Sequence, residues 1–269
     1  MRNKISLSTY GHEGVEDLRR FNRNSFKKYC NSKLSSVKKH IHFIKKNKSK
    51  KYTGKVLEIG SGSGKLLFSM EKNDLLQEGI GCEVSKSRSR FSNKFKKEFG
   101  FKKVKIVNKN FLDLKLKNNY FDLIIGIDCV INYIGSNPKH IKKLINTCKK
   151  SLKKGGYLIF EFTTFGREKS MIQQSPTKKY LTWKKLSVED PFIFGLFEIS
   201  YSPKGLIVYN KFFLEKNKKL NLKNISHRRE KLVSLSKKYF TKKRFKIFDF
   251  WKKNDDILDE EFIALFKKN

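Results

Sequence analysis

A glycine-rich loop between two apolar segments is the part of this sequence best suited to hold a small ligand. The stretch VLEIGSGSGKLL places Glu58 at the end of an apolar run and Gly60, Gly62 and Gly64 directly after it. Glycines at every second position leave backbone amides without side chains beside them, so a ligand can approach the chain closely. The loop therefore predicts a cofactor held largely by backbone groups.

Two phosphate-binding interpretations fit this loop poorly. A P-loop requires GxxxxGK followed by Ser or Thr, whereas Ile59 occupies the first glycine position and Leu66 follows Lys65. A dinucleotide-binding loop requires GxGxxG, and here the third glycine comes one residue early. Glu58 would also repel a pyrophosphate. A carboxylate at the end of a strand, beside bare backbone, suits a cationic ligand instead.

The elements that position this loop alternate between strands and helices. Hydrophobic periodicity and turn residues predict strands at 55–60, 79–84, 103–108, 121–128 and 155–162, and helices at 14–30, 32–46, 65–76, 86–99 and 138–152. Short connections between such elements indicate a parallel sheet covered on both faces, with right-handed crossovers.

The pattern changes after residue 164, where short alternating segments predict antiparallel hairpins. Strands are expected at 194–202, 205–215, 220–227, 244–251 and 260–268, with a helix at 229–239. No repeat or low-complexity linker divides the chain, so we expect one domain that carries an insertion near 165–227.

Residues 53 to about 165 resemble the core of the class I S-adenosylmethionine-dependent methyltransferases. The family's first motif, E/DxGxGxG, is matched by Glu58, Gly60, Gly62 and Gly64, and the acid expected after the second strand is Glu83 in GIGCEV. NKNFLDL resembles the family's GDAxDL segment, although Asn110 stands where an Asp is usual. FDLIIGIDCVINYI and LKKGGYLIFEF resemble the segments around the fourth and fifth strands.

This resemblance implies the cofactor S-adenosylmethionine, with S-adenosylhomocysteine as product. The residues expected to bind it are Glu58, Gly60, Gly62, Gly64, Glu83, Val84, Asn110, Phe111 and Ile127. Glu83 is expected to bind the ribose hydroxyls. The amide oxygen of Asn110 can accept the hydrogen bond from the adenine amine that an Asp usually accepts.

The resemblance also implies the fold and its division. We expect an α/β, Rossmann-like sheet of seven mostly parallel strands with helices on both faces, an antiparallel last strand and a β-rich insertion after strand five. Residues 1–52 would form an N-terminal helical cap, 53–164 and 228–269 the methyltransferase core, and 165–227 a lid over the acceptor.

Candidate catalytic residues should lie at the carboxyl ends of the strands, where open sheets bind ligands. They are Asp128, His140 and His227, and substrate-binding candidates are Asn132, Arg228 and Arg229. Each catalytic candidate keeps a structural alternative: a turn or cofactor-lining role for Asp128, an ordinary helix start for His140, and a surface position for His227. No metal is required, because the sulfonium already makes the methyl group electrophilic. His12, His40 and His42 are expected to be exposed.

The acceptor is constrained by absent motifs. The chain lacks the [DNS]PP[YFW] segment of amino-methylating relatives and the Pro-Cys pair of cytosine C5 enzymes. A strand-rich insertion resembles small-molecule O- and N-methyltransferases, so we expect a small, anionic acceptor such as a sugar or a nucleotide-linked sugar. An RNA methyltransferase and an inactive cofactor-binding scaffold are the alternatives.

Composition sets the remaining bounds. The 269 residues carry a net charge of +37, which indicates either a polyanionic partner such as RNA or a codon bias toward lysine. We favour codon bias, because the lysines are dispersed along the chain. No apolar run is long enough to span a membrane and no signal peptide is recognisable. Cys30, Cys82, Cys129 and Cys148 form no CxxC pair, so reduced thiols and a cytoplasmic location are expected.

Overall fold

The computed structural model describes most of the chain. The described residues are 16, 18–46, 54–128, 130–134, 138–163, 171–185, 192–201, 206–215, 220–228, 245–252 and 261–268. The predicted helix at 229–239, together with His12, Cys129 and Arg229, lies outside them. Within this part of the chain, no helix has both the length and the apolar character needed to cross a bilayer.

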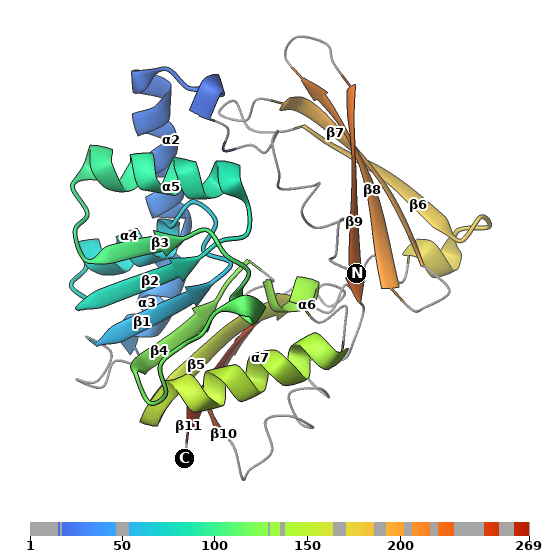
Figure 1. Ribbon diagram of the computed structural model, residues 1–269. Helices are drawn as coiled ribbons and strands as arrows, with labels where there is room; N and C mark the ends of the chain where they lie inside the picture. The colour runs from blue at the N-terminus through green and yellow to red at the C-terminus, as the bar shows by residue number, and fades with distance from the viewer. Residues whose placement is uncertain are drawn as a thin grey trace.

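One sheet forms the centre of the molecule, in the order β10-β11-β5-β4-β1-β2-β3 (Figure 1). Its strands are β1 (Lys55–Ile59), β2 (Glu78–Cys82), β3 (Val104–Val107), β4 (Phe121–Gly126), β5 (Leu152–Thr163), β10 (Phe245–Lys252) and β11 (Glu261–Lys268). The β1–β5 pairs are parallel, whereas β11 runs antiparallel to both of its neighbours. The predicted α/β fold with a mostly parallel sheet is confirmed.

Helices cover both faces of this sheet. The segments that cover it are η1 (Leu18–Arg20), α2 (Arg23–Ser36), α3 (Lys38–Lys46), α4 (Lys65–Lys72), α5 (Lys86–Phe99), η3 (Phe111–Asp113), α6 (Val130–Ile134) and α7 (Pro138–Ser151). One buried cluster contains residues of α2, α3, α4 and α5 together with Leu123 and Ile125 of β4. The other contains residues of α7 and η3 together with Ile124 of β4. Successive strand residues therefore point to opposite cores, as expected for a sheet buried on both sides.

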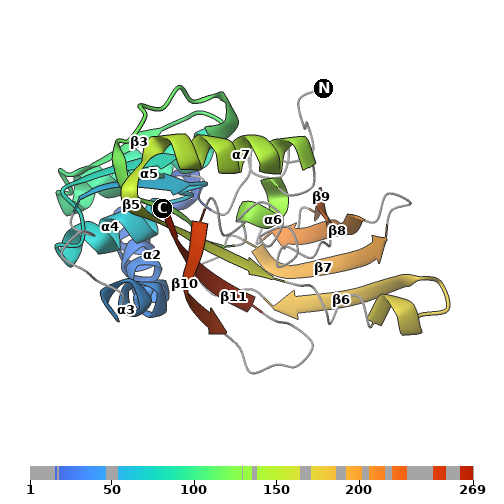
Figure 2. The same cartoon turned by 90° about the horizontal axis from the view of Figure 1, so that it is seen from below.

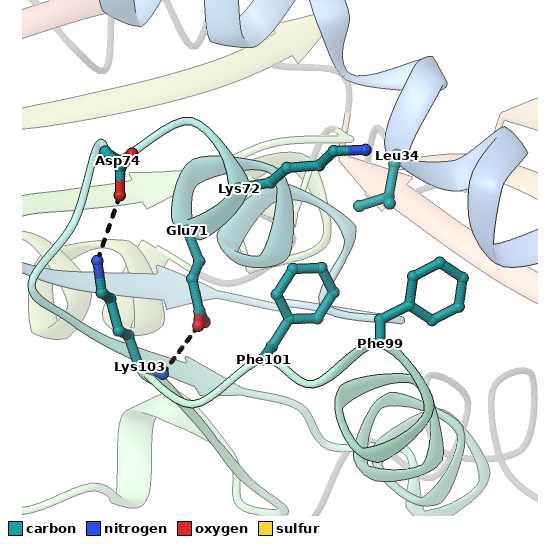
Figure 3. Close-up of a pocket in the computed structure, with 7 residues that line it drawn as sticks. All are labelled: Leu34, Glu71, Lys72, Asp74, Phe99, Phe101 and Lys103. Atoms are coloured by element: carbon teal, nitrogen blue, oxygen red, sulfur yellow. Dashed lines mark hydrogen bonds and ion pairs between the residues drawn. The ribbon is translucent and has the colours of Figure 1, made fainter.

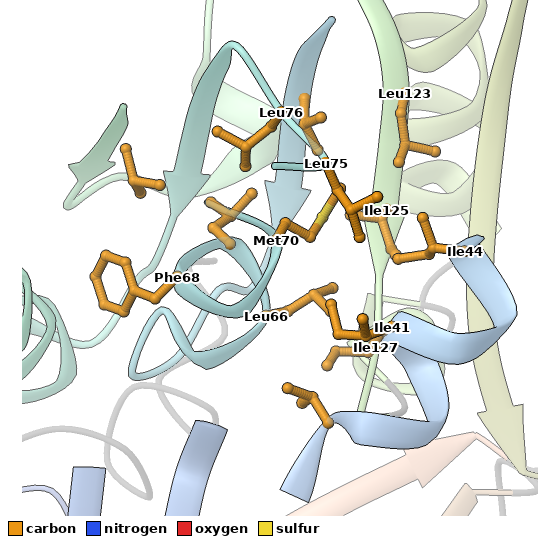
Figure 4. Packing of buried hydrophobic residues seen from close by; sticks show 14 of the residues in the cluster. Ile41, Ile44, Leu66, Phe68, Met70, Leu75, Leu76, Leu123, Ile125 and Ile127 are labelled. Atoms are coloured by element: carbon orange, nitrogen blue, oxygen red, sulfur yellow. The ribbon is translucent and has the colours of Figure 1, made fainter. Parts of the chain in front are cut away.

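The N-terminal helices are anchored in the first of these cores (Figure 4). Ile41 and Ile44 of α3 pack beside Leu66 of α4 and Ile125 of β4, in the same buried cluster. The N-terminal helices therefore share one hydrophobic core with α4 and this face of the sheet.

Several predicted boundaries differ from the observed ones. The predicted break at residue 31 is wrong: α2 begins after Asn22, whose side-chain oxygen accepts from Ser25 N–H, and ends at Ser36, before its C-cap Val37. The helix predicted to Leu76 ends at Lys72, because the Asn73 side chain donates to a carbonyl of the last turn and the next residue has a positive φ. The helix 86–99 is confirmed, with a Ser85 cap at its start.

A second, antiparallel sheet follows β5 in the chain, in the order β6-β7-β8-β9. Its strands are β6 (Lys179–Lys185), β7 (Phe192–Tyr201), β8 (Leu206–Glu215) and β9 (Leu220–Arg228). Both views show it standing apart from the first sheet, on the side where α6 lies (Figures 1 and 2). The sequence did not predict β6, which is an edge strand with exposed Leu181 and Trp183.

We predict that truncating a leucine in the core lowers the free energy of unfolding, whereas truncating a leucine on the edge strand β6 does not. Leu123→Ala on β4 removes a fully buried side chain, so unfolding free energy should fall by about 2–5 kcal/mol. The matched control Leu181→Ala, at a residue 62% exposed, should change it by less than about 0.5 kcal/mol. Urea denaturation of both variants checks this, and equal losses would contradict the assigned core.

Candidate functional site

The glycine loop connects β1 to α4 at the carboxyl edge of the sheet. Gly60, Gly62 and Gly64 all have positive φ, at +66°, +53° and +78°, which other residues rarely adopt. A Cβ at Gly60 would lie 2.4 Å from a methyl carbon of Val130, so α6 packs directly against the loop. A Cβ at Gly62 would meet Arg88 Nη1 at 3.6 Å, an ordinary contact distance. The Gly62 N–H donates to Glu83, and its carbonyl accepts from the Ser92 hydroxyl.

Carboxylates from several strands gather at this same edge. Glu58 ends β1, Glu83 follows β2, Asp128 follows β4 and Glu161 lies near the end of β5. The parallel arrangement brings these ends together, although the chain as a whole carries a net charge of +37. The edge is therefore locally acidic on a strongly basic protein, which favours a cationic ligand there.

Glu58 is a buried acid with one carboxyl oxygen, Oε2, that lacks a hydrogen-bond partner among the described residues. The residue is 1% exposed. Burial raises the pKa of Glu58 well above its usual value of 4.5; Lys65 lowers it, and Asp128 raises it further. A buried carboxyl group with an unused oxygen is poised to ionise against a bound cation.

Glu83 is held beneath the glycine loop by two backbone amides. Its Oε2 accepts from Gly62 N–H at 2.8 Å and its Oε1 accepts from Ser85 N–H at 2.7 Å. Each oxygen keeps a second lone pair for a ligand hydroxyl. Val84 beside it is 36% exposed, an apolar surface at the same edge. This placement agrees with the predicted ribose contact, which stays a prediction.

The remaining predicted cofactor residues divide between a cap and the core. Asn110 is exposed, and its Oδ1 accepts from Leu112 N–H at 3.0 Å, capping the short helix η3. Phe111 is 4% exposed and Ile127 is 2% exposed, so both side chains serve packing. Predicted contacts of these two residues with a cofactor therefore rest on their backbone groups.

Asp128 lies two residues after the end of β4 and contacts the start of α4. Its Oδ2 is 2.6 Å from Nζ of Lys65, the residue that follows the glycine loop. Asp128 has a φ of +52°, and its backbone N–H donates to Oε2 of Glu161 at 2.8 Å. We predicted no role for Lys65 from the sequence, although its position directly after Gly64 is a signal that could have identified it.

The predicted acceptor-side residues fall on elements that contact each other. Asn132 lies on α6, and α6 contacts β9, which carries His227 and Arg228. Strand register pairs His227 with Ile207 and Arg228 with Leu206. His140 is half-buried in the first turn of α7. Their catalytic and binding roles stay predictions.

The expectation that His40 is exposed is wrong. It is 5% exposed, and its Nε2 lies 2.9 Å from Oε2 of Glu161. His42, two residues along the same helix, is exposed as expected. A partner 121 positions away leaves no trace in local periodicity, so the sequence could not reveal this pair.

A separate hollow lies at the far end of α4 from the glycine loop (Figure 3). Its lining residues are Leu34, Glu71, Lys72, Asp74, Phe99, Phe101 and Lys103. Glu71 accepts from Lys103 N–H at 3.1 Å, and the Lys103 ammonium lies 3.4 Å from Asp74. Because these groups tie the start of β3 to the end of α4, we assign the hollow a packing role.

Comparison with known proteins identifies the class. A family model described as a methyltransferase domain matches residues 50–196. A solved S-adenosylmethionine-dependent methyltransferase from Clostridium acetobutylicum ATCC 824 superposes with a TM-score of 0.67 at 17% identity, covering 91% of this chain and 92% of that one. The CcbJ methyltransferase from Streptomyces caelestis gives 0.63 at 14% identity, with coverages of 79% and 82%.

Two further similarities are narrower in what they show. The sugar N-methyltransferase KedS8 from Streptoalloteichus sp ATCC 53650 gives a TM-score of 0.54 at 10% identity, covering 79% of this chain and 80% of that one. A stretch of 81 residues, 29% of this chain, is 35% identical to part of cyclosporin synthetase simA from Tolypocladium inflatum. It spans a share of that protein's length that rounds to 0%.

The chain therefore belongs to the methyltransferase-domain family, with the Rossmann-like fold of that class. The family, the transferase class and the cofactor S-adenosylmethionine expected from the sequence are confirmed at the level of this domain.

We predict that Glu58 makes folding stability depend on pH. With a folded-state pKa raised above 4.5, protonated Glu58 incurs no penalty at low pH, and the penalty grows as pH rises toward the raised pKa. Without cofactor, Glu58→Gln should gain stability relative to the unaltered chain over that window and then hold the gain. Thermal unfolding of both proteins across pH measures the difference, and a difference that does not vary with pH would contradict it.

Proposed function

We propose that this chain transfers a methyl group from S-adenosylmethionine to an oxygen or nitrogen atom of a small, anionic metabolite, such as a sugar or a nucleotide-linked sugar. The carboxylate cluster beside the glycine loop is the observation that carries the cofactor half of this proposal. When bound, the cofactor supplies an electrophilic methyl group on a sulfonium.

The residues at the carboxyl edge fit such a cofactor. The unpartnered oxygen of Glu58 offers a negative charge for a cationic group, and Glu83 offers free lone pairs for hydroxyls. Gly60, Gly62 and Gly64 put no side chains of their own into the loop, so a ligand can approach it closely. Lys65, which follows the glycine loop, is paired with the Asp128 carboxylate, and this pairing reduces its repulsion of a cation.

The position of the second sheet supports the part of the proposal that concerns the acceptor. We propose that residues 165–227 form a lid, while 1–52 form a cap and 53–164 with 228–269 form the core. The contact between α6 and β9 supports this division, because it brings Arg228 to the side of the molecule where Asn132 lies. Arg228 and Arg229 would bind an anionic group of the acceptor.

The protein would supply alignment, exclusion of water and a base for a hydroxyl acceptor. Asp128, His140 and His227 are the proposed bases. Asp128 is 57% exposed and paired with Lys65, so its carboxylate is held at the open edge and accessible. KedS8, named as a sugar N-methyltransferase, shares the fold and lends support to a sugar acceptor. Free, buried Cys30, Cys82 and Cys148 support a cytoplasmic location.

An RNA acceptor is the second candidate, favoured by the outer face of α7. A shallow hollow there is lined by Lys139, Lys142, Lys143, Asn146, Thr147 and Lys150. No Asp or Glu occurs between Asp128 and Glu161 in the sequence. Binding of single-stranded RNA by this face would weaken with salt, with a log–log slope of about −0.7 per contacted phosphate.

We predict that Glu83→Ala abolishes binding of S-adenosylmethionine, because it removes both the proposed ribose contact and the brace under Gly62. Glu78→Ala, at the start of the strand that Glu83 follows, is the matched control and should bind the cofactor normally. Isothermal calorimetry checks both variants. Unchanged affinity in the Glu83 variant would overturn the assigned cofactor site.

Incubation with cofactor labelled in its methyl group, and with metabolite and RNA fractions in parallel, should label a small anionic compound. Once that acceptor is purified, Arg228→Ala should raise its KM, whereas Arg90→Ala on exposed α5 surface should leave KM unchanged. Label that appears only in RNA would favour the second candidate. No labelled product in either fraction would favour a cofactor-binding scaffold.

A further inference from the structure

A buried histidine–glutamate pair joins the N-terminal helices to the carboxyl edge of the sheet. Nε2 of His40 on α3 lies 2.9 Å from Oε2 of Glu161 on β5, and the residues are 5% and 1% exposed. With Glu161 ionised, its carboxylate can only accept hydrogen bonds, and Nε2 of His40 is then the donor. Such charge-assisted bonds are about twice as strong as neutral ones.

The same carboxylate oxygen also holds the segment that follows β4. Oε2 of Glu161 accepts the backbone N–H of Asp128 at 2.8 Å. Asp128 adopts a φ of +52°, a conformation that persists in non-glycine residues only where the surroundings impose it. The hydrogen bond to Glu161 is one such constraint.

This backbone geometry determines where the Asp128 carboxylate lies. From its left-handed position the side chain reaches Lys65, whose Nζ is 2.6 Å from Oδ2 and which starts α4 directly after the glycine loop. Val130, two residues further along, packs on Gly60. Asp128 and Val130 thus contact the two ends of the glycine loop, and Glu161 holds the backbone of Asp128 between β4 and α6.

The position of His40 is itself fixed by packing. Its neighbours Ile41 and Ile44 are buried against β4 in the cluster of Figure 4. Nδ1 of His40 has no hydrogen-bond partner among the described residues, so the bond to Glu161 orients the ring. The contacts therefore connect His40 on α3 to Glu161 on β5, and Glu161 to the backbone of Asp128 after β4.

We propose that His40 and Glu161 are positioning residues of the methyl-transfer site, which hold Asp128 and the glycine loop in their ligand-binding arrangement. This inference rests on the proposed function. It differs from a purely structural role because the group that Glu161 orients is the amide of a residue whose own side chain is 57% exposed at the cofactor edge.

The test measures binding of S-adenosylhomocysteine by calorimetry and the Asp128 amide resonance by NMR in the full chain. His40→Leu keeps the apolar volume but removes the donor, so affinity should fall about tenfold and the Asp128 resonance should shift. His40→Gln, whose side-chain NH2 can occupy the Nε2 position, should restore affinity to within about twofold. His42→Leu, on the exposed face of the same helix, is the matched control and should change neither readout.

The outcomes separate this inference from the proposed function. A His40→Leu protein that is less thermally stable but binds S-adenosylhomocysteine as the unaltered chain does would overturn the positioning role alone. An unaltered chain that does not bind S-adenosylhomocysteine would overturn the proposed function and this inference with it. If His40→Leu does not fold, the same question is answered with the unaltered chain by NMR. Saturating S-adenosylhomocysteine should then shift the resonances of the His40 Nε2–H and of the Asp128 amide together. A His40 resonance that does not move would contradict the inference.

Discussion

The organisation of this protein depends on a cluster of acidic side chains gathered at one edge of a parallel sheet. Parallel strands place their carboxyl ends together, and here those ends carry Glu58, Glu83, Asp128 and Glu161. Backbone amides satisfy Glu83, and Lys65 pairs with Asp128, but one oxygen of the buried Glu58 has no partner among the described residues. Burying such a group is unfavourable unless a cation completes it. We therefore propose that the choice of cofactor follows from this acidic edge on a chain with a net charge of +37.

The elements around this edge support one another. Gly60 must be a glycine because Val130 of α6 occupies the space of a side chain, and α6 in turn contacts β9 of the second sheet. On the other side, α3 reaches the same post-β4 segment through His40 and Glu161. Among the described residues, α3 thus reaches the residue that follows β4 through Glu161, and the second sheet contacts α6 directly.

Much of the fold could be predicted from the sequence, because its signals are local. Strands β1–β5 are apolar runs between turn residues, and α5 has both a serine cap and a terminal glycine. The glycine loop and Glu83 were recognisable from type and spacing. The sequence did not reveal the short helix α6, the early end of α4, the edge strand β6 or the buried His40. Those features arise from side-chain caps and from tertiary contacts such as the bond between His40 and Glu161, which no periodicity records.

The most direct test of this account is a competition measured by calorimetry at raised salt, where nonspecific attraction of anions to the basic surface is screened. The purified chain is titrated with S-adenosylmethionine in the presence and absence of saturating ATP or NAD. An acidic edge predicts saturable binding of S-adenosylmethionine, with an affinity that neither nucleotide reduces. Displacement of S-adenosylmethionine by ATP or NAD, or tighter binding of either nucleotide at the glycine loop, would contradict it.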